Sequence, residues 1–225
     1  MYDWKELLEK VNQEIKEVGT GRSPQELYEP IRYVLSLGGK RIRPVLMLLA
    51  YNIYKESVEK IYPQALAIET YHNYTLLHDD LMDRADVRRG RPTVHKKWND
   101  NAAILSGDSM LVLAYQYMLK GCPLDKTNDV LNLFTETALE IGEGQQYDIE
   151  FETRNDVREE EYIEMIRLKT SVLLACALKI GAILADAPME QADLLYRFGE
   201  NLGLAFQLQD DYLDVYGDPA VFGKK

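Results

Sequence analysis

The chain has 225 residues, of which 46% are hydrophobic, and it carries a formal net charge of −11. This composition predicts a folded globular chain and excludes an intrinsically disordered protein. The negative charge also argues against nucleic acid as a partner, because contacts to phosphate backbones need a basic surface.

The sequence predicts helices along almost its whole length. Apolar residues recur at three- and four-residue steps, as in Trp4, Leu7, Leu8 and Val11, and no run shows the sustained alternation typical of strands. Glycine and proline divide the chain into expected helices over residues 3–18, 25–37, 42–55, 60–84, 101–119, 125–150, 159–185 and 190–216. No repeat or linker composition interrupts this series, so we expect one all-α domain over residues 1–225.

The cysteines and the apolar runs of the sequence indicate where in the cell the protein is located. Cys122 and Cys176 are far apart and match no metal-binding spacing, which is typical of proteins from a reducing cytosol. The N-terminal helix lacks the apolar centre of a signal peptide. The longest apolar stretch, residues 171–187, is interrupted by Lys179 and is too short to span a bilayer. We therefore expect a cytoplasmic protein that does not span a membrane.

The sequence contains one aspartate motif twice, as DDLMD at residues 79–83 and as DDYLD at residues 210–214. Helical positions four apart share a face, so Asp79 and Asp83 project together, as do Asp210 and Asp214. Such paired carboxylates suit magnesium, which also keeps waters and binds substrate phosphates. One copy alone could be a solvated acidic face. Both copies follow apolar residues, where unpaired carboxylates are costly, so the pair predicts a metal site.

Two basic segments accompany these motifs, GGKRIRP at residues 38–44 and RRGRP at residues 88–92. The planar fork of arginine suits phosphate oxygens, and lysine adds a point charge. Each segment alone could be a solvated loop. Together with the carboxylates they predict two anion sites, one bridged by metal and one held by side chains. His72 lies seven residues before Asp79 and hence almost on its face, although a buried structural histidine is the alternative.

Several motifs occur in the order seen in polyprenyl synthetases: GGKRIRP, HDDLMD with RRGRPTVH, Gly144-Gln145 with Asp148, Lys169-Thr170, QLQDDYLD and a final FGK. From about residue 30 to its end, the chain resembles a trans-isoprenyl diphosphate synthase. The resemblance implies an all-α isoprenoid synthase helical bundle with a central substrate cavity, and a homodimer. It also implies that isopentenyl diphosphate is joined head to tail to an allylic diphosphate (dimethylallyl, geranyl or farnesyl), with release of diphosphate.

The resemblance assigns residues to four roles. Isopentenyl diphosphate would be held by Lys40, Arg43, His72 and Arg89. Up to three magnesium ions would be held by Asp79, Asp83, Asp210 and Asp214. The metals would bind the allylic diphosphate together with Arg88, Lys169 and Lys224. The developing allylic cation would be stabilised near Lys169, Thr170 and Gln207.

Residues upstream of the first motif bear on product length. Tyr71 and Thr75 precede Asp79 at four-residue steps, so they lie below it on one helix face. Tyr74 occupies the fifth position before Asp79, where a bulky residue limits growth in related short-chain enzymes. We therefore expect a product of fifteen to twenty carbons, while ordinary core packing of the tyrosine and a longer product are the alternatives.

Other readings of the motifs are weaker. A class I terpene cyclase shares the fold and the first motif but normally carries an Asn/Asp-Ser/Thr-Glu second motif. A di-iron bundle needs two Glu-x-x-His sequences, and only Glu69 with His72 forms one. A regulatory synthase subunit would be expected to lose aspartates that this chain keeps. Chains of the family usually continue for several more helices and a further lysine, so we expect this chain to lack C-terminal helices.

Overall fold

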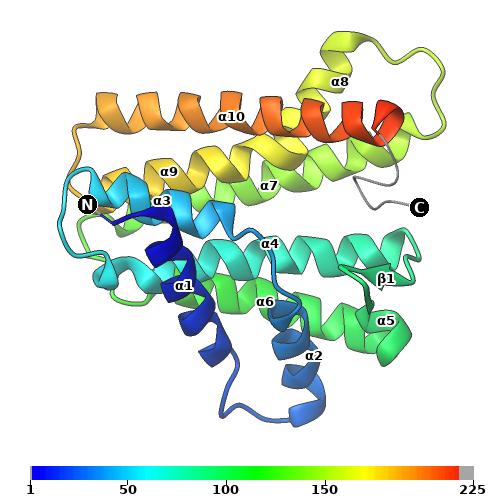
Figure 1. Ribbon diagram of the computed structural model, residues 1–225, viewed down its shortest axis with the longest axis horizontal. Coiled ribbons are helices and arrows are strands. Elements are labelled where there is room, and N and C mark those ends of the chain that lie inside the picture. The colour runs from blue at the N-terminus through cyan, green and yellow to red at the C-terminus, as the bar shows by residue number, and fades with distance from the viewer. Residues whose placement is uncertain (1, 218–225) are drawn as a thin grey trace.

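The structure, a computed structural model, describes residues 2–217 (Figure 1). The long helices α4, α6, α7, α9 and α10 lie side by side along the long axis, and α1 and α2 cross on one side of them. The helices are α1 (Trp4–Glu14), α2 (Gln25–Ser36), α3 (Ile42–Asn52), α4 (Tyr62–Met82), α5 (Val94–Lys97), α6 (Asp100–Leu119), α7 (Thr127–Phe151), α8 (Glu159–Ile166), α9 (Val172–Leu184) and α10 (Met189–Tyr216), with short 3₁₀ turns at Ile15–Glu17 and Glu59–Ile61. The expected all-α fold class is confirmed.

One hairpin departs from the helical pattern. Strands β1 (Val87–Arg88) and β2 (Arg91–Pro92) pair antiparallel through a turn formed by Arg89 and Gly90. Both turn residues have positive φ, 52° and 73°, which is the geometry that joins two twisted strands through two residues. Strands this short leave no alternating pattern in the sequence.

The expected helix over residues 159–185 is interrupted in the structure. A π-helical segment, Arg167–Ser171, separates α8 from α9. Two glycines on neighbouring helices fit closely against it, since a Cβ on Gly144 would lie 2.4 Å from the Lys169 nitrogen and one on Gly203 would lie 2.5 Å from the Ser171 Cα. Wide π turns recur at functional sites, and this one carries Lys169 and Thr170.

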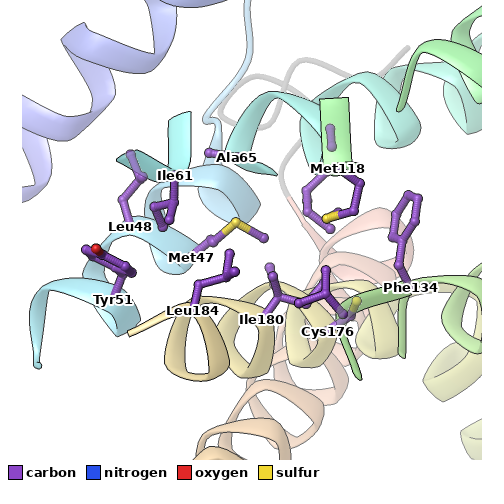
Figure 2. Close-up of a cluster of buried hydrophobic side chains, with 14 of the residues drawn as sticks. Met47, Leu48, Tyr51, Ile61, Ala65, Met118, Phe134, Cys176, Ile180 and Leu184 are labelled. Carbon is purple, nitrogen blue, oxygen red and sulfur yellow. The ribbon is translucent and has the colours of Figure 1, made fainter. Parts of the chain in front are cut away.

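The main hydrophobic core fills the space between α3, α4, α6, α7 and α9 (Figure 2). Phe134, Met118 and Ile180 are fully buried there, and Cys176 lies among them as a buried thiol. Each such large apolar side chain contributes about 1.5–3 kcal/mol by burial. This core holds in place the helices that also carry the polar residues described next. Within residues 2–217, no helix has the length and apolar character needed to cross a membrane.

Candidate active site

A cavity of about 570 Å³ opens between the loop before α3, α4, α7, the π turn and α10. Its basic side is formed by Lys40, Arg41, Arg43 and Arg89. Its Asp79 side is formed by Asp79, Lys169, Thr170 and Gln207. The structure thus brings together nine of the predicted site residues around one space: Lys40, Arg43, His72, Thr75, Asp79, Arg89, Lys169, Thr170 and Gln207.

Helix α4 supplies one wall of the cavity. Its cavity-facing residues Glu69, His72, Thr75 and Asp79 follow each other at three- and four-residue steps, as expected for one helix face. A proline at the start of α4 suits its first turn. The periodicity that predicted a shared face for His72 and Asp79 is therefore matched by the structure.

Asp79 and Asp83 form an acidic pair that fits a cation. Asp79 Oδ1 is buried and has no hydrogen-bond partner among the described residues, although the Lys169 ammonium lies 3.7 Å from it. Burial raises the pKa of Asp83, and the neighbouring carboxylate of Asp79 raises it further. A buried carboxylate oxygen without a donor is costly unless a cation faces it. In the described part of the chain, no three acidic, histidine or cysteine groups gather tightly enough to hold an ion. An ion at this pair would therefore complete its shell with water and phosphate oxygens.

The second aspartate motif lies near the C-terminal end of α10. Gln207 lines the cavity, and Asp210 and Asp214 follow it by three and seven residues on the same helix face. Both aspartates are exposed. The second aspartate of the motif, Asp211, is engaged by protein donors: Gln207 Nε2 donates to it at 2.8 Å, and the Tyr162 hydroxyl donates to its other oxygen.

The π turn links the two motif-bearing helices. Lys169 Nζ donates to Asp148 at 2.6 Å and lies 3.7 Å from Asp79 Oδ1. The Thr170 hydroxyl donates to Gln207 Oε1 at 3.1 Å. An ammonium near Asp79 and a hydroxyl paired with an amide thus line the same cavity. This is the group for which the resemblance implied a role at the reacting centre.

The basic side of the cavity depends on two glycines and a hairpin. Gly38 and Gly39 have φ of 82° and 140°, and a Cβ on Gly39 would lie 2.9 Å from Arg89 Nη1. Arg89 donates to the Gly38 carbonyl, so the hairpin turn holds the loop that precedes α3. Arg43 Nη1 lies 3.2 Å from His72 Nε2, and burial lowers the Arg43 pKa to about 10.

His72 is neutral in this environment. Burial lowers its pKa well below 6.5, and the adjacent charges of Arg43 and Arg89 lower it further. Its ring nitrogen can then accept a hydrogen bond from Arg43.

The His72 shift predicts acid sensitivity. Below pH 6.5 the unfolded chain protonates this histidine while the folded chain does not, so its stabilising contribution is present above that pH and is lost as pH falls. Relative to His72→Gln, the wild-type free energy of unfolding should fall by about 1.4 kcal/mol per pH unit below that point. Urea unfolding of both proteins between pH 7.5 and 5.5 measures this difference, and a constant difference would contradict the assignment.

Arg88 lies beside the first motif but outside the cavity lining. Its Nε donates to both oxygens of Asp80 at 2.8 Å, and its Nη2 is 3.7 Å from Asp79. It therefore adds positive charge behind the acidic pair. Lys224 and the final FGK sequence lie outside the described residues.

The three residues predicted to bear on product length separate in the structure. Thr75 lines the cavity. Tyr71 and Tyr74 instead pack against the hydrophobic core, with ring centroids 5.4 Å apart; the Tyr71 hydroxyl donates to the Ala138 carbonyl, and Tyr74 contacts His78. They form the packed layer beside the cavity on the side of α6 and α7.

Sequence reasoning missed two charged lining residues, Glu69 and Arg41, and gave no role to Asp148. Arg41 donates to Glu69 at 2.6 Å, and both side chains are almost fully buried. Asp148 is the hydrogen-bond partner of Lys169. Glu69 could have been identified from its position three residues before His72 on the same helix face. Asp148 could have been identified because it belongs to the motif segment that begins at Gly144.

Comparisons with known proteins agree with this geometry. The sequence profile of the family described as Polyprenyl synthetase matches residues 24–225. The chain is 44% identical over 203 residues to the geranylgeranyl diphosphate synthase of Methanosarcina mazei, covering 89% of this chain and 62% of that protein. It is 40% identical over 220 residues to the short chain isoprenyl diphosphate synthase of Methanocaldococcus jannaschii, covering 98% of this chain and 66% of that one.

The fold is shared with solved structures. A crystal structure of geranylgeranyl pyrophosphate synthase superposes with a TM-score of 0.94 at 50% identity, covering 97% of this chain and 67% of that chain. The geranylgeranyl pyrophosphate synthetase of Pyrococcus horikoshii gives 0.93 at 37% identity, covering 99% and 69%. The predicted isoprenoid synthase fold is thereby confirmed. By profile, sequence and fold, the chain belongs to the polyprenyl synthetase family of trans-isoprenyl diphosphate synthases.

Proposed function

We propose that the protein joins isopentenyl diphosphate head to tail to an allylic diphosphate and releases diphosphate. The observation that carries this proposal is the cavity itself. It has a basic side, where the described residues offer Lys40 and Arg43 no carboxylate partner, and a side with Asp79, whose Oδ1 accepts no hydrogen bond from them and lies 3.7 Å from the Lys169 ammonium. Lys169, Thr170 and Gln207 adjoin that second side. The names of the M. mazei and M. jannaschii relatives support the same reaction class.

The residues of the cavity divide the work of this reaction. Lys40, Arg43 and Arg89 bind the diphosphate of isopentenyl diphosphate, and neutral His72 orients Arg43. Asp79 and Asp83 on α4, with Asp210 and Asp214 on α10, would hold up to three magnesium ions. When bound, these ions would neutralise the negative charge that develops on the allylic diphosphate as its C–O bond breaks.

The other residues beside Asp79 act on the two charges that this bond cleavage separates. Lys169, and the more distant Arg88, place positive charge near the leaving diphosphate. The hydroxyl oxygen of Thr170 and the amide oxygen of Gln207 place negative dipole ends near the allylic cation. The double bond of isopentenyl diphosphate then attacks that cation, and the released diphosphate takes the proton that is lost. No dedicated protein base is needed.

We propose a product of fifteen to twenty carbons. The M. mazei relative is named a geranylgeranyl diphosphate synthase, which supports the upper end of that range, whereas a Natronomonas pharaonis relative with 39% identity is named a geranylfarnesyl diphosphate synthase. A longer product is therefore the second candidate. The aromatic layer of Tyr71 and Tyr74 beside the cavity is the feature that would stop growth of the chain.

Replacing Tyr74 with alanine should lengthen the product by at least one isoprene unit. The substitution removes a ring that packs against both Tyr71 and His78, and it opens space between α4 and α6 into which an apolar chain can extend. Product sizing by chromatography after incubation with labelled isopentenyl diphosphate measures this effect. Tyr117→Ala, which opens a partly buried site on α6 away from the cavity lining, is the control. Products of wild-type length from Tyr74→Ala would count against the role.

We further propose that the protein is cytoplasmic, that each chain forms one domain, and that two chains form a homodimer. The outer face of α6 supports a self-association surface, because it exposes Leu105 and Val112 at 58% and 68%. Large exposed apolar side chains in a row are unusual on monomers. Sedimentation of the purified protein measures the oligomeric state, and a monomer at micromolar concentration would contradict this proposal.

The reaction itself is tested by incubating the full-length protein with magnesium, labelled isopentenyl diphosphate and, separately, dimethylallyl, geranyl and farnesyl diphosphates. Elongation that EDTA abolishes would support the prenyltransferase and its metal dependence. Conversion of an allylic diphosphate without consumption of isopentenyl diphosphate would instead favour a cyclase. A folded protein with no turnover of either kind would refute the enzymatic proposal.

A further inference from the structure

Arg41 is a buried arginine, and each of its three side-chain nitrogens donates a hydrogen bond within the protein. Its side chain is 2% exposed, and its Nη1 donates to Glu69 Oε1 at 2.6 Å. Its Nη2 donates to the Leu35 carbonyl near the end of α2 at 2.6 Å, and its Nε donates to Asn12 Oδ1 at 3.3 Å. Although Arg41 stands between Lys40 and Arg43 in a basic loop, it is buried and each of its side-chain nitrogens already has a protein partner.

Glu69 is the carboxylate nearest to the basic side of the cavity. Two carboxylates line the described cavity, Glu69 and Asp79, and they are ten residues, or about 15 Å, apart along α4. The charge of Glu69 counteracts the lowering of the pKa of Arg43 and of Arg89 by burial, so it acts on both guanidinium groups. A carboxylate in this position could pair with either of them.

Among residues 2–217, Arg43 has no carboxylate partner. Its Nε is buried without a hydrogen bond, and its Nη1 meets the neutral ring of His72. Lys40 contacts only an aromatic ring in the described residues, with its ammonium 5.6 Å from the centroid of Phe206. In the described part of the chain, Lys40 and Arg43 thus line the cavity without a carboxylate partner, next to Glu69, which is already paired with Arg41.

The backbone at Arg41 indicates that this arrangement is held under constraint. Arg41 adopts φ 47° and ψ 36°, a left-handed conformation that is unfavourable for a residue with a Cβ. Such conformations persist where surrounding contacts over-determine them, and they gather at functional sites. Here the contacts are three hydrogen bonds: Arg41 donates to Asn12 and to the Leu35 carbonyl, and Asn73 donates to Glu69.

We propose that Arg41 is a positioning residue that occupies Glu69 and thereby leaves Lys40 and Arg43 free to bind the diphosphate of isopentenyl diphosphate. This inference rests on the proposed function. Without Arg41, the buried charge of Glu69 would be uncompensated, and Arg43 would be its nearest replacement partner. Glu69 would then compete with the substrate diphosphate for the same guanidinium group.

The test compares Arg41→Met, Arg41→Lys and the double variant Arg41→Met/Glu69→Gln in the full-length protein. Arg41→Met should raise the KM for isopentenyl diphosphate by about tenfold or more and change kcat and the allylic KM by less than about twofold. Arg41→Lys keeps a charge beside Glu69 and should stay within about threefold of the wild-type KM. The double variant removes the competing carboxylate and should also return to within about threefold.

A matched control separates positioning from stability. Lys126 also caps helix carbonyls and pairs with a carboxylate, but at the other end of α9, where it donates to the Ile183 carbonyl at 2.9 Å and contacts Asp186. Lys126→Met should lower the thermal midpoint without changing the KM for isopentenyl diphosphate. The double variant buries no unpaired charge, so it keeps the test available if Arg41→Met alone does not fold.

A double variant whose KM for isopentenyl diphosphate is raised by about tenfold would overturn the inference, because neutralising Glu69 would then not be the role of Arg41. Equal increases in both substrate KM values for Arg41→Met would overturn it as well. Calorimetry on the same variants can measure the binding of inorganic pyrophosphate in the absence of magnesium, and this measurement needs no turnover. Weakened binding in Arg41→Met and recovery in the double variant would support the inference even if the wild-type protein proved inactive.

Discussion

Replacing Asp79 with asparagine is expected to lower kcat by about a hundredfold to a thousandfold or more, the range seen when one preorganised electrostatic group is removed from a reacting centre. Asparagine keeps the size of the side chain but removes the charge. Asp79 Oδ1 is buried without a donor, and its carboxylate lies 3.7 Å from both Lys169 and Arg88. Loss of its charge would therefore weaken the cation site and leave Lys169 to pair with Asp148 alone.

Steady-state kinetics over a range of magnesium concentrations measures this effect. The apparent magnesium requirement of the variant should rise together with the fall in kcat, because both follow from one lost ligand. Asp193→Asn is the matched control, since Asp193 lies on α10 and pairs with Lys179 at 2.6 Å, far along the chain from both aspartate motifs. An Asp79→Asn enzyme with a normal magnesium requirement would contradict the placement of the metal site.

Helical periodicity predicted the cavity wall on α4. The step from His72 to Thr75 and Asp79 could be counted in the sequence, and the structure places all three along one lining face. The same reasoning applies to Gln207, Asp210 and Asp214 on α10. A helix is a local structure, so spacing within it determines which side chains share a face.

Contacts between distant segments could not be predicted in this way. The left-handed backbone of Arg41 has no signature in its residue type, and its partner Glu69 lies 28 residues further along the chain. The π turn at Lys169 depends on close approach by Gly144 and Gly203 from two other helices. These features result from packing, which overrides local propensity where helices meet.

The residues predicted to limit product length also show what spacing within a helix can predict and what depends on packing between helices. Spacing placed Tyr71, Thr75 and Asp79 on one face of α4. In the structure only Thr75 and Asp79 reach the cavity lining, while Tyr71 turns its hydroxyl to the Ala138 carbonyl on α7. Each four-residue step along a helix leaves an offset of about 40°, so Tyr71 lies about 80° around α4 from Asp79 and enters different surroundings. Which of those surroundings a growing chain enters depends on the helices packed beside α4.

Arg43→Gln is expected to act on the basic side of the cavity and on a different kinetic parameter. It should raise the KM for isopentenyl diphosphate by about a hundredfold, or ~2.7 kcal/mol, with a change in kcat of less than about fivefold. Arg43 is held unpaired, with a buried Nε that lacks a partner and a neutral histidine at its Nη1. A charged donor that meets its acceptor only when substrate is bound contributes mainly to binding, and glutamine retains hydrogen-bonding capacity without the charge.

Arg84→Gln provides the comparison, because Arg84 is exposed and pairs with Asp100 at 2.7 Å outside the cavity. Kinetics at saturating allylic diphosphate separates the two parameters. With Asp79→Asn acting on kcat and Arg43→Gln on KM, the two variants would assign catalysis and isopentenyl diphosphate binding to different sides of one cavity. If Arg43→Gln instead lowered kcat and left the KM unchanged, Arg43 would serve the leaving diphosphate, and the assignment of the basic side to isopentenyl diphosphate would be wrong.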